Sequence, residues 1–170
     1  ILFVGARDRM EMIKVPAHGY KIKGLWISGF KRKLSLGNLL FPFKVVYSLF
    51  HSLIIISKFK PEVVIGTGGF ASGPILFIAS LFKIPTLIQE QNSYPGITTR
   101  LYADKAQVVC IAFDEAKNYL KGHCIVTGNP TRKSILNGHR SDAAKTFNFS
   151  PGKDTVFLFG GSQGSAALNK

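Results

Sequence analysis

Two glycine-rich loops follow apolar strands in this 170-residue chain, and their residue types suit ligand binding. The first reads Gly-Thr-Gly-Gly-Phe-Ala-Ser-Gly-Pro over residues 66–74, and the second reads Gly-Gly-Ser-Gln-Gly-Ser over residues 160–165. Glycines let backbone N–H groups approach a ligand closely, and the helix that follows points its positive end at the same place. Neither loop ends in the Lys-Ser/Thr of a P-loop or fits GxGxxG, so phosphate or sugar contact and tight strand–helix packing both remain open.

A polar segment, Gln89 to Gly96, lies between the two loops and follows another expected strand. Its amide side chains donate and accept hydrogen bonds and its carboxylate accepts them, which suits a hydroxyl-rich ligand such as a sugar. An ordinary polar surface turn is the alternative. The loop Gly-Asn-Pro-Thr-Arg at 128–132 also follows a strand, and Arg132 could hold a diphosphate, although a lone surface arginine is the commoner situation.

No metal-ligand spacing and no nucleophile–His–acid set is recognisable in the sequence, so we expect neither a metal nor another cofactor. Cys110 and Cys124 each lie in an apolar run, and we expect two buried thiols there. The four histidines are far apart in the sequence: His18, His51, His123 and His139.

The elements that must position these loops are short apolar strands alternating with helices. This pattern predicts a Rossmann-like parallel α/β sheet with ligands at the carboxyl ends of its strands. We expect strands at residues 1–4, 25–27, 62–65, 84–88, 107–111 and 123–127. We expect helices within residues 39–59 and at 73–82, 98–103 and 114–120.

The composition predicts a first domain over residues 1–136, a polar linker over 137–153 and the start of a second α/β domain over 154–170. The second domain is inferred because a new strand runs into a new glycine loop after the linker. The chain opens on an apolar segment that resembles the middle of a strand and stops in what looks like the first turn of a helix. We therefore expect both ends to be truncated.

Positive charge is concentrated early in the chain, which has a net charge of +13 and no Asp or Glu between Met12 and Pro61. Such a field attracts polyanions, but no basic recognition helix or aromatic-studded strand is apparent, so we expect no nucleic-acid partner. The uncharged run from Val45 to Ser57 is shorter than the ~20 apolar residues of a spanning helix, so an interfacial helix and an ordinary buried helix both fit. The candidates for contact with an anionic membrane are Lys31, Arg32, Lys33, Lys44, Lys58 and Lys60.

Four motifs occur together in the order and spacing of one enzyme family. They are the loop at 66–74, Glu-Gln-Asn at 90–92 with Gly96, the loop at 128–132, and the loop at 160–165 with Asn169. Over essentially its whole length the chain resembles the MurG family of glycosyltransferases. That family moves N-acetylglucosamine from UDP-N-acetylglucosamine to lipid I and forms lipid II in peptidoglycan synthesis.

The resemblance implies a GT-B fold of two Rossmann-like domains, the first lacking its first strand here, and an inverting, metal-independent hexosyltransferase. It also implies a peripheral protein at the cytoplasmic face of the bacterial inner membrane, with lipid I and anionic lipid as partners. By motif match, UDP-N-acetylglucosamine is contacted by Asn92, Arg132 and Ser162. The glycine loops and the acceptor side contribute Thr67, Gly68, Gly69, Glu90, Gly160, Gly161, Gly164 and Asn169.

The chain also departs from the family pattern. The family's Gly-Gly-Thr-Gly-Gly-His loop, with its general-base histidine, is expected before Ile1, so we assign no catalytic residue and expect the chain to be inactive by itself. Phe70, Gln89 and Thr99 stand where Tyr, His and Asn are usual, which leaves the acceptor contacts open. Two other functions fit the chain: another lipid glycosyltransferase, such as one acting on diacylglycerol, and a non-catalytic module that binds anionic membrane through residues 31–60.

Overall fold

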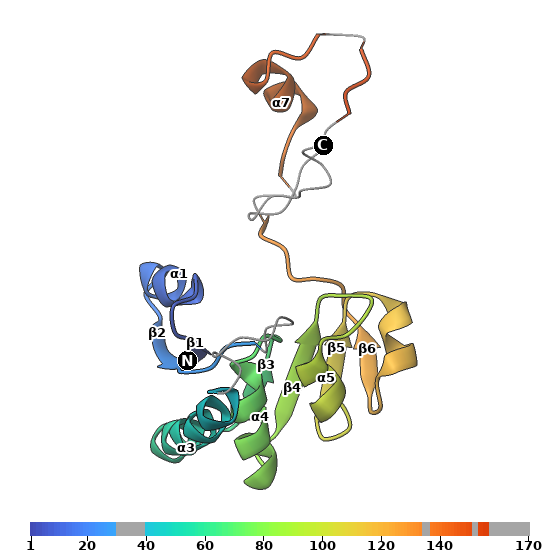
Figure 1. Cartoon of the computed structure of the whole chain (residues 1–170). Coiled ribbons are helices and arrows are strands. Elements are labelled where there is room, and N and C mark those ends of the chain that lie inside the picture. The colour runs from blue at the N-terminus through green and yellow to red at the C-terminus, as the bar shows by residue number, and fades with distance from the viewer. Residues whose placement is uncertain (30–39, 134–136, 151–152, 157–170) are drawn as a thin grey trace. The chain divides into compact units, whose positions relative to one another are not determined.

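The computed structural model describes residues 1–29, 40–133, 137–150 and 153–156 (Figure 1). The chain divides into two compact units, residues 1–129 and 130–170, and each is described by itself. Several expected site residues lie outside the described residues: Lys31, Arg32, Lys33, Gly160, Gly161, Ser162, Gly164 and Asn169. The strand expected at the start of the second domain, from residue 154, is described only as far as residue 156, and these residues have no regular structure.

The centre of the first unit is a parallel four-stranded sheet in the order β3-β4-β5-β6 (Figure 1). Ile88 of β4 pairs with Val109 of β5, and both side chains are fully buried. Strands of this kind, apolar and covered by helices, are the ones predicted for a Rossmann-like sheet, and that prediction is confirmed. The strands are β3 (Val64–Gly66), β4 (Thr86–Glu90), β5 (Val108–Ile111) and β6 (Cys124–Val126).

A second, two-stranded parallel sheet is formed by β1 (Leu2–Ala6) and β2 (Lys21–Leu25). The prediction of a strand at 25–27 was therefore wrong, because β2 ends at Leu25. The alternating exposure of Lys21, Ile22 and Lys23 has the two-residue period of a strand. The crossover between these strands contains α1 (Glu11–Ala17), which was not predicted because it includes Pro16.

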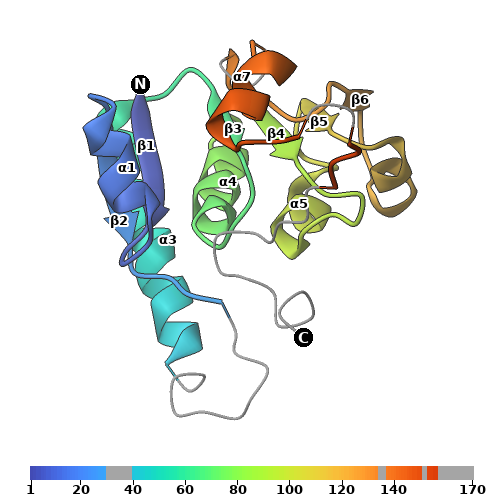
Figure 2. The same ribbon diagram turned by 90° about the horizontal axis from the view of Figure 1, so that it is seen from above.

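Three α-helices and one 3-10 helix accompany the four-stranded sheet. α3 packs against both α4 and β2, and α4 packs against β3, β4 and α5 (Figures 1 and 2). The fully buried Leu76 of α4 contributes to the core between these layers. The helices are α3 (Phe41–Phe59), α4 (Ser72–Leu81), α5 (Ile97–Tyr102) and the 3-10 helix η1 (Asp114–Tyr119), where a short helix was expected.

The helix α3 has two faces of different character. Ser48, Ser52 and Ile55 are buried on one face, and the Ser48 hydroxyl donates to the Trp26 carbonyl oxygen at 3.1 Å. Among the described helices α3 has the length and apolar composition that a membrane-spanning helix needs, although a core helix can meet the same criterion. Its packing against α4 and β2 makes it an integral part of this fold.

The second unit contains α7 (Arg140–Thr146), which lies within the expected linker. Beyond it, the rings of Phe147 and Phe149 stack with centroids 5.5 Å apart. The domain boundaries at 136 and 153 remain predictions.

Candidate functional site

The carboxyl ends of β3, β4 and β6 bring three of the predicted loops together in the first unit. Parallel strands end at the same edge of a sheet, and hydrogen bonds join the loops there. The Gln91 side-chain amide donates to the Thr67 carbonyl oxygen at 3.1 Å, and the Asn129 amide donates to the Gln91 carbonyl oxygen at 3.3 Å. The glycine loop, the Glu-Gln-Asn loop and Asn129 therefore form one connected edge of the first unit.

The glycine loop has a backbone conformation that requires its glycines. Gly68 and Gly69 have φ values of 85° and 75°, in the left-handed region that other residues rarely adopt. The Ser72 hydroxyl donates to the Gly68 carbonyl oxygen, and the Thr98 hydroxyl donates to the Gly69 carbonyl oxygen at 3.3 Å. Both ends of the turn are thus held to the helices α4 and α5 that follow in the chain.

The Glu90 carboxylate is the most completely bonded polar group of the site. Only 3% of the residue is exposed, since Glu90 shares the buried face of β4 with Thr86 and Ile88. One carboxylate oxygen accepts from the Asn92 backbone and side-chain amides at 3.0 and 2.8 Å. The other accepts from the Gly96 backbone N–H at 2.9 Å and the Thr99 hydroxyl at 2.6 Å.

The charge state of Glu90 follows from these contacts. Burial by itself raises the pKa of the Glu90 carboxyl, because a charged group loses its hydration. The hydrogen bonds from Thr99, Gly96 and Asn92 favour the charged form, and together they hold the pKa below its ordinary value. Glu90 is therefore an ionised carboxylate at neutral pH.

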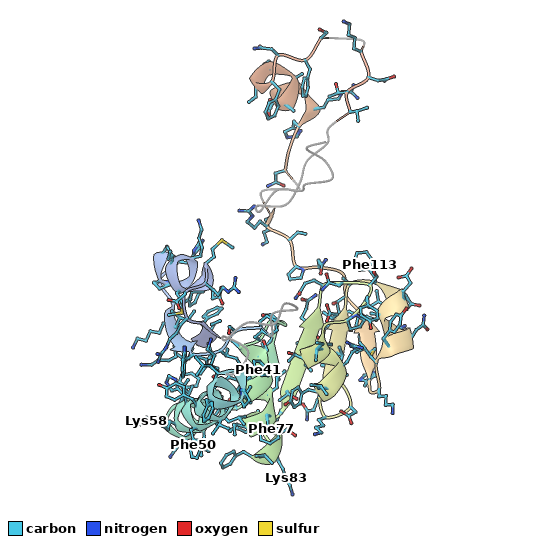
Figure 3. The ribbon with its side chains drawn as sticks, in the orientation of Figure 1. Phe41, Phe50, Lys58, Phe77, Lys83 and Phe113 are labelled. Carbon is cyan, nitrogen blue, oxygen red and sulfur yellow. The ribbon has the colours of Figure 1, made fainter. Side chains whose placement is uncertain are left out.

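A cavity of about 640 Å³ opens beside this edge of the sheet. Gly68, Glu90 and Asn92 contribute to its polar end, and Phe41 and Phe77 come from α3 and α4 (Figure 3). Such a cavity can accept a ligand that has both a polar and an apolar part. The other apolar residues of its wall are Ile27, Val45, Leu49, Phe70, Pro74, Ile97, Leu101 and Tyr102.

A region with more basic than acidic side chains lies beside the carboxyl ends of β1 and β2, where cavities of about 740 and 230 Å³ share Arg7, Asp8 and Arg9. The Arg7 guanidinium donates to the Gly24 carbonyl oxygen at 3.2 Å, a neutral partner that leaves its charge available to an anion. His51 lines the larger cavity; burial lowers its pKa, and the positive charges of Arg7 and Lys23 lower it further. Arg7 was not predicted as a site residue, although its position directly after a strand could have indicated one.

The predicted membrane residues that the structure describes lie on or next to α3. The Lys44 ammonium donates to the Ser28 hydroxyl at 3.0 Å and lies 5.5 Å from the centre of the Trp26 ring. Phe50 and Lys58 project outward from α3 (Figure 3), and Phe50 is 65% exposed. Lys60 follows α3 directly and is also exposed.

Three further observations concern predicted residues and sites outside this edge of the sheet. Arg132 is exposed and belongs to the second unit. Within the described part of the chain, no group of three or more His, Cys, Asp or Glu side chains could hold a metal ion. Cys110 and Cys124 are free thiols that are half-buried, not fully buried as expected.

Comparisons with protein families and with curated proteins both find glycosyltransferases. Residues 1–111 match the N-terminal domain of glycosyltransferase family 28. The whole chain is 53% identical to the UDP-N-acetylglucosamine--N-acetylmuramyl-(pentapeptide) pyrophosphoryl-undecaprenol N-acetylglucosamine transferase of Christiangramia forsetii, and it covers 47% of that protein. It is 50% identical to the transferase of the same name from Flavobacterium psychrophilum, with the same coverage of each chain. The chain thus spans about half the length of the curated relatives it matches.

A solved structure supports the fold. The chain is similar to the crystal structure of Acinetobacter baumannii MurG, with a TM-score of 0.59 and 28% identity. The match covers 78% of this chain and 37% of the other.

Proposed function

The chain belongs to glycosyltransferase family 28, and from this membership we propose that it is the acceptor-side half of an N-acetylglucosaminyltransferase. The donor is UDP-N-acetylglucosamine, and the acceptor is lipid I, an undecaprenyl-diphosphate-linked muramoyl pentapeptide. The product is lipid II of the peptidoglycan pathway. One observation carries this proposal: the chain is 53% identical over its full length to a transferase named for this donor sugar and acceptor.

The proposed reaction is an inverting displacement. The 4-hydroxyl oxygen of the acceptor's muramoyl group forms a bond to C1 of the donor sugar, and the bond from C1 to the UDP oxygen breaks. UDP leaves with the bonding electron pair, and the hydroxyl proton passes to a base. The part of this chain is to bind and orient both substrates, which can supply a large share of the rate acceleration.

The site residues divide between the two substrates. Asn92, Arg132 and Ser162 would hold the donor, and the second glycine loop with Gly160, Gly161, Gly164 and Asn169 would surround its UDP. Thr67, Gly68 and Gly69 would meet the acceptor's diphosphate, since this left-handed turn can bring backbone N–H groups to an anion. The hydrogen bond from the Gln91 side chain to the Thr67 carbonyl oxygen supports this arrangement, because it holds the loop that carries Asn92 next to the glycine loop that would bind the acceptor substrate.

The test is sugar transfer by the protein expressed from the complete reading frame that encodes this chain. Labelled UDP-N-acetylglucosamine is supplied with a lipid I analogue in one reaction and with diacylglycerol in another. The proposal predicts label on the lipid I analogue only. Transfer to diacylglycerol would favour the other lipid glycosyltransferase, and liposome binding without any nucleotide-sugar binding would favour a non-catalytic membrane module.

We further propose that the outward face of α3 docks on an anionic membrane. Phe43, Val46, Phe50 and Ile54 are spaced to form one stripe along the helix, and all four are exposed. Lys58 continues the same stripe one turn later, and the exposed Lys60 follows the helix. Apolar residues that can enter the lipid, next to cations that meet its headgroups, are typical of an interfacial helix. The protein would thus be peripheral at the cytoplasmic face of the inner membrane.

The docking proposal predicts a specific loss on changing Lys58 to Gln. A lysine near an anionic surface contributes about 1 kcal/mol, so we expect roughly five-fold weaker binding to phosphatidylglycerol-containing liposomes. Lys121→Gln is the matched control, because Lys121 is exposed and follows η1, which packs on β5, whereas α3 packs on α4 and β2. Sedimentation with liposomes at low and high salt measures both. Equal losses for the two variants, or binding that salt does not weaken, would contradict the docking face.

A further inference from the structure

The Asn92 side chain lies between a buried carboxylate and the cavity beside the sheet edge. Its Nδ2 atom is 2.8 Å from one oxygen of Glu90, while the residue itself is exposed and lines the cavity. The same carboxylate oxygen accepts from the Asn92 backbone N–H at 3.0 Å. Asn92 is therefore held by Glu90 at two points.

The chemistry of Glu90 decides which way the Asn92 amide faces. An asparagine amide can usually be placed in either of two orientations, because its oxygen and nitrogen have the same shape. An ionised carboxylate only accepts hydrogen bonds, so the atom facing it must be the donor Nδ2. The Asn92 Oδ1 atom must then point away from Glu90.

We propose that Glu90 is a positioning residue that locks the Asn92 amide with its oxygen directed at the ligand, so that this point of the site selects a hydrogen-bond donor such as a hydroxyl group. The inference rests on the proposed function, in that it takes the ligand at Asn92 to be the sugar of the donor. It adds the direction of the hydrogen bond: the sugar hydroxyl donates and Asn92 accepts.

The lock is specific to a carboxylate. The two oxygens of Glu90 receive four donors, two from Asn92, one from the Gly96 backbone and one from Thr99. Glutamine at position 90 would place an NH2 group against one of these donor pairs, and that pair would lose its acceptor oxygen. Either Asn92 is released, or the start of α5 at Gly96 and Thr99 is released, which moves the loop that carries Asn92.

The central test uses the wild-type protein from the complete reading frame. It compares substrate analogues, so the result does not depend on whether a variant folds. Values of kcat/KM are measured for a series of monodeoxy and monofluoro analogues of UDP-N-acetylglucosamine. Fluorine can accept a weak hydrogen bond but cannot donate one. At one sugar position we expect the deoxy and fluoro analogues to lose activity equally, by roughly 10-fold, as for a lost donor. Full activity of the fluoro analogue at the sugar position whose penalty depends on Asn92 would overturn the proposal.

Two variants identify that position and its dependence on Glu90. In Asn92→Ala the penalty at that position should disappear, while the exposed neighbour Ser93→Ala should keep it. In Glu90→Gln we expect a fall in kcat/KM of up to about 100-fold, together with loss of the equality between deoxy and fluoro analogues. A merely structural Glu90 would lower activity and leave that equality intact.

A measurement without turnover separates the positioning role from the donor contact. In the NMR spectrum the Asn92 side-chain NH2 should exchange slowly with water in wild type and faster in Glu90→Gln. No change in that exchange would overturn the lock itself. Slow exchange in wild type, combined with an equal effect of Asn92→Ala on every sugar analogue, would instead contradict the contact between Asn92 and the nucleotide sugar. That result would refute the proposed function at this residue and the ligand part of the inference, but not the positioning of Asn92 by Glu90.

Discussion

Replacing Thr99 with valine removes one hydroxyl and keeps the shape of the side chain. The Thr99 hydroxyl donates to the Glu90 carboxylate at 2.6 Å, and the two residues are only 1% and 3% exposed. A hydrogen bond to a charged group contributes about 1.5–3 kcal/mol, and at this depth water cannot take its place. Since valine leaves no cavity, we expect a local destabilisation of about 2–3 kcal/mol at pH 7.

The effect should depend on pH in a direction fixed by the Glu90 pKa. The folded-state pKa of Glu90 lies below its ordinary value, so its stabilising contribution is fully present above that ordinary value. That contribution is lost as the pH falls through the lowered folded-state pKa. The difference between wild type and Thr99→Val should therefore be complete at pH 7 and shrink at acidic pH, as the pH falls toward the lowered folded-state pKa of Glu90.

Hydrogen exchange measured by mass spectrometry, on peptides that cover residues 86–102, gives the local opening free energy. The matched control is Thr98→Val, which loses a 3.3 Å bond to the Gly69 carbonyl at a less buried position and should cost less than about 1 kcal/mol. Thr99→Ser should restore most of the stability. Equal costs for the two valine variants, or a difference that grows as the pH falls, would refute the account of Glu90.

Two further pairs of variants test the backbone and the packing. Gly69→Ala should destabilise by about 1–2 kcal/mol, because its φ of 75° is costly for alanine even with open space around it, whereas Gly73→Ala in α4 should be neutral or slightly stabilising. Ser48→Ala should cost about 1 kcal/mol by leaving the Trp26 carbonyl unpaired, whereas Ser52→Ala should be neutral or stabilising, since its buried hydroxyl has no partner among the described residues. Thermal unfolding of each pair measures these differences, and a reversed order within either pair would contradict the structure.

The parallel sheet could be predicted from the sequence because its strands are short apolar runs that end at glycine or polar loops. The edge that joins residues 66–69, 90–92 and 129 follows from that topology, since parallel strands end together. The helix α1 could not be predicted in the same way. Its Pro16 is typical of a helix breaker, but it falls in the last turn, where the helix ends at the next residue.

The role of Glu90 could be predicted only in part. The two-residue period of β4 places Glu90 on the same face as Ile88, so the burial of Glu90 could be predicted from the sequence. Its partners were not, because Gly96 and Thr99 reach it through a turn whose geometry no periodicity describes. Thr99 stood out only as a departure from the usual asparagine, and the structure places it as a hydrogen-bond donor to the Glu90 carboxylate.

The central claim, that this chain helps to transfer N-acetylglucosamine to a lipid-linked acceptor, is tested most directly by mass analysis of one product. The protein from the complete reading frame is incubated with UDP-N-acetylglucosamine and a lipid I analogue, beside Asn92→Ala as the impaired control. The account predicts an analogue carrying one added N-acetylhexosamine, formed much more slowly by Asn92→Ala. An unmodified analogue, with a folded protein that binds liposomes but not the nucleotide sugar, would contradict it.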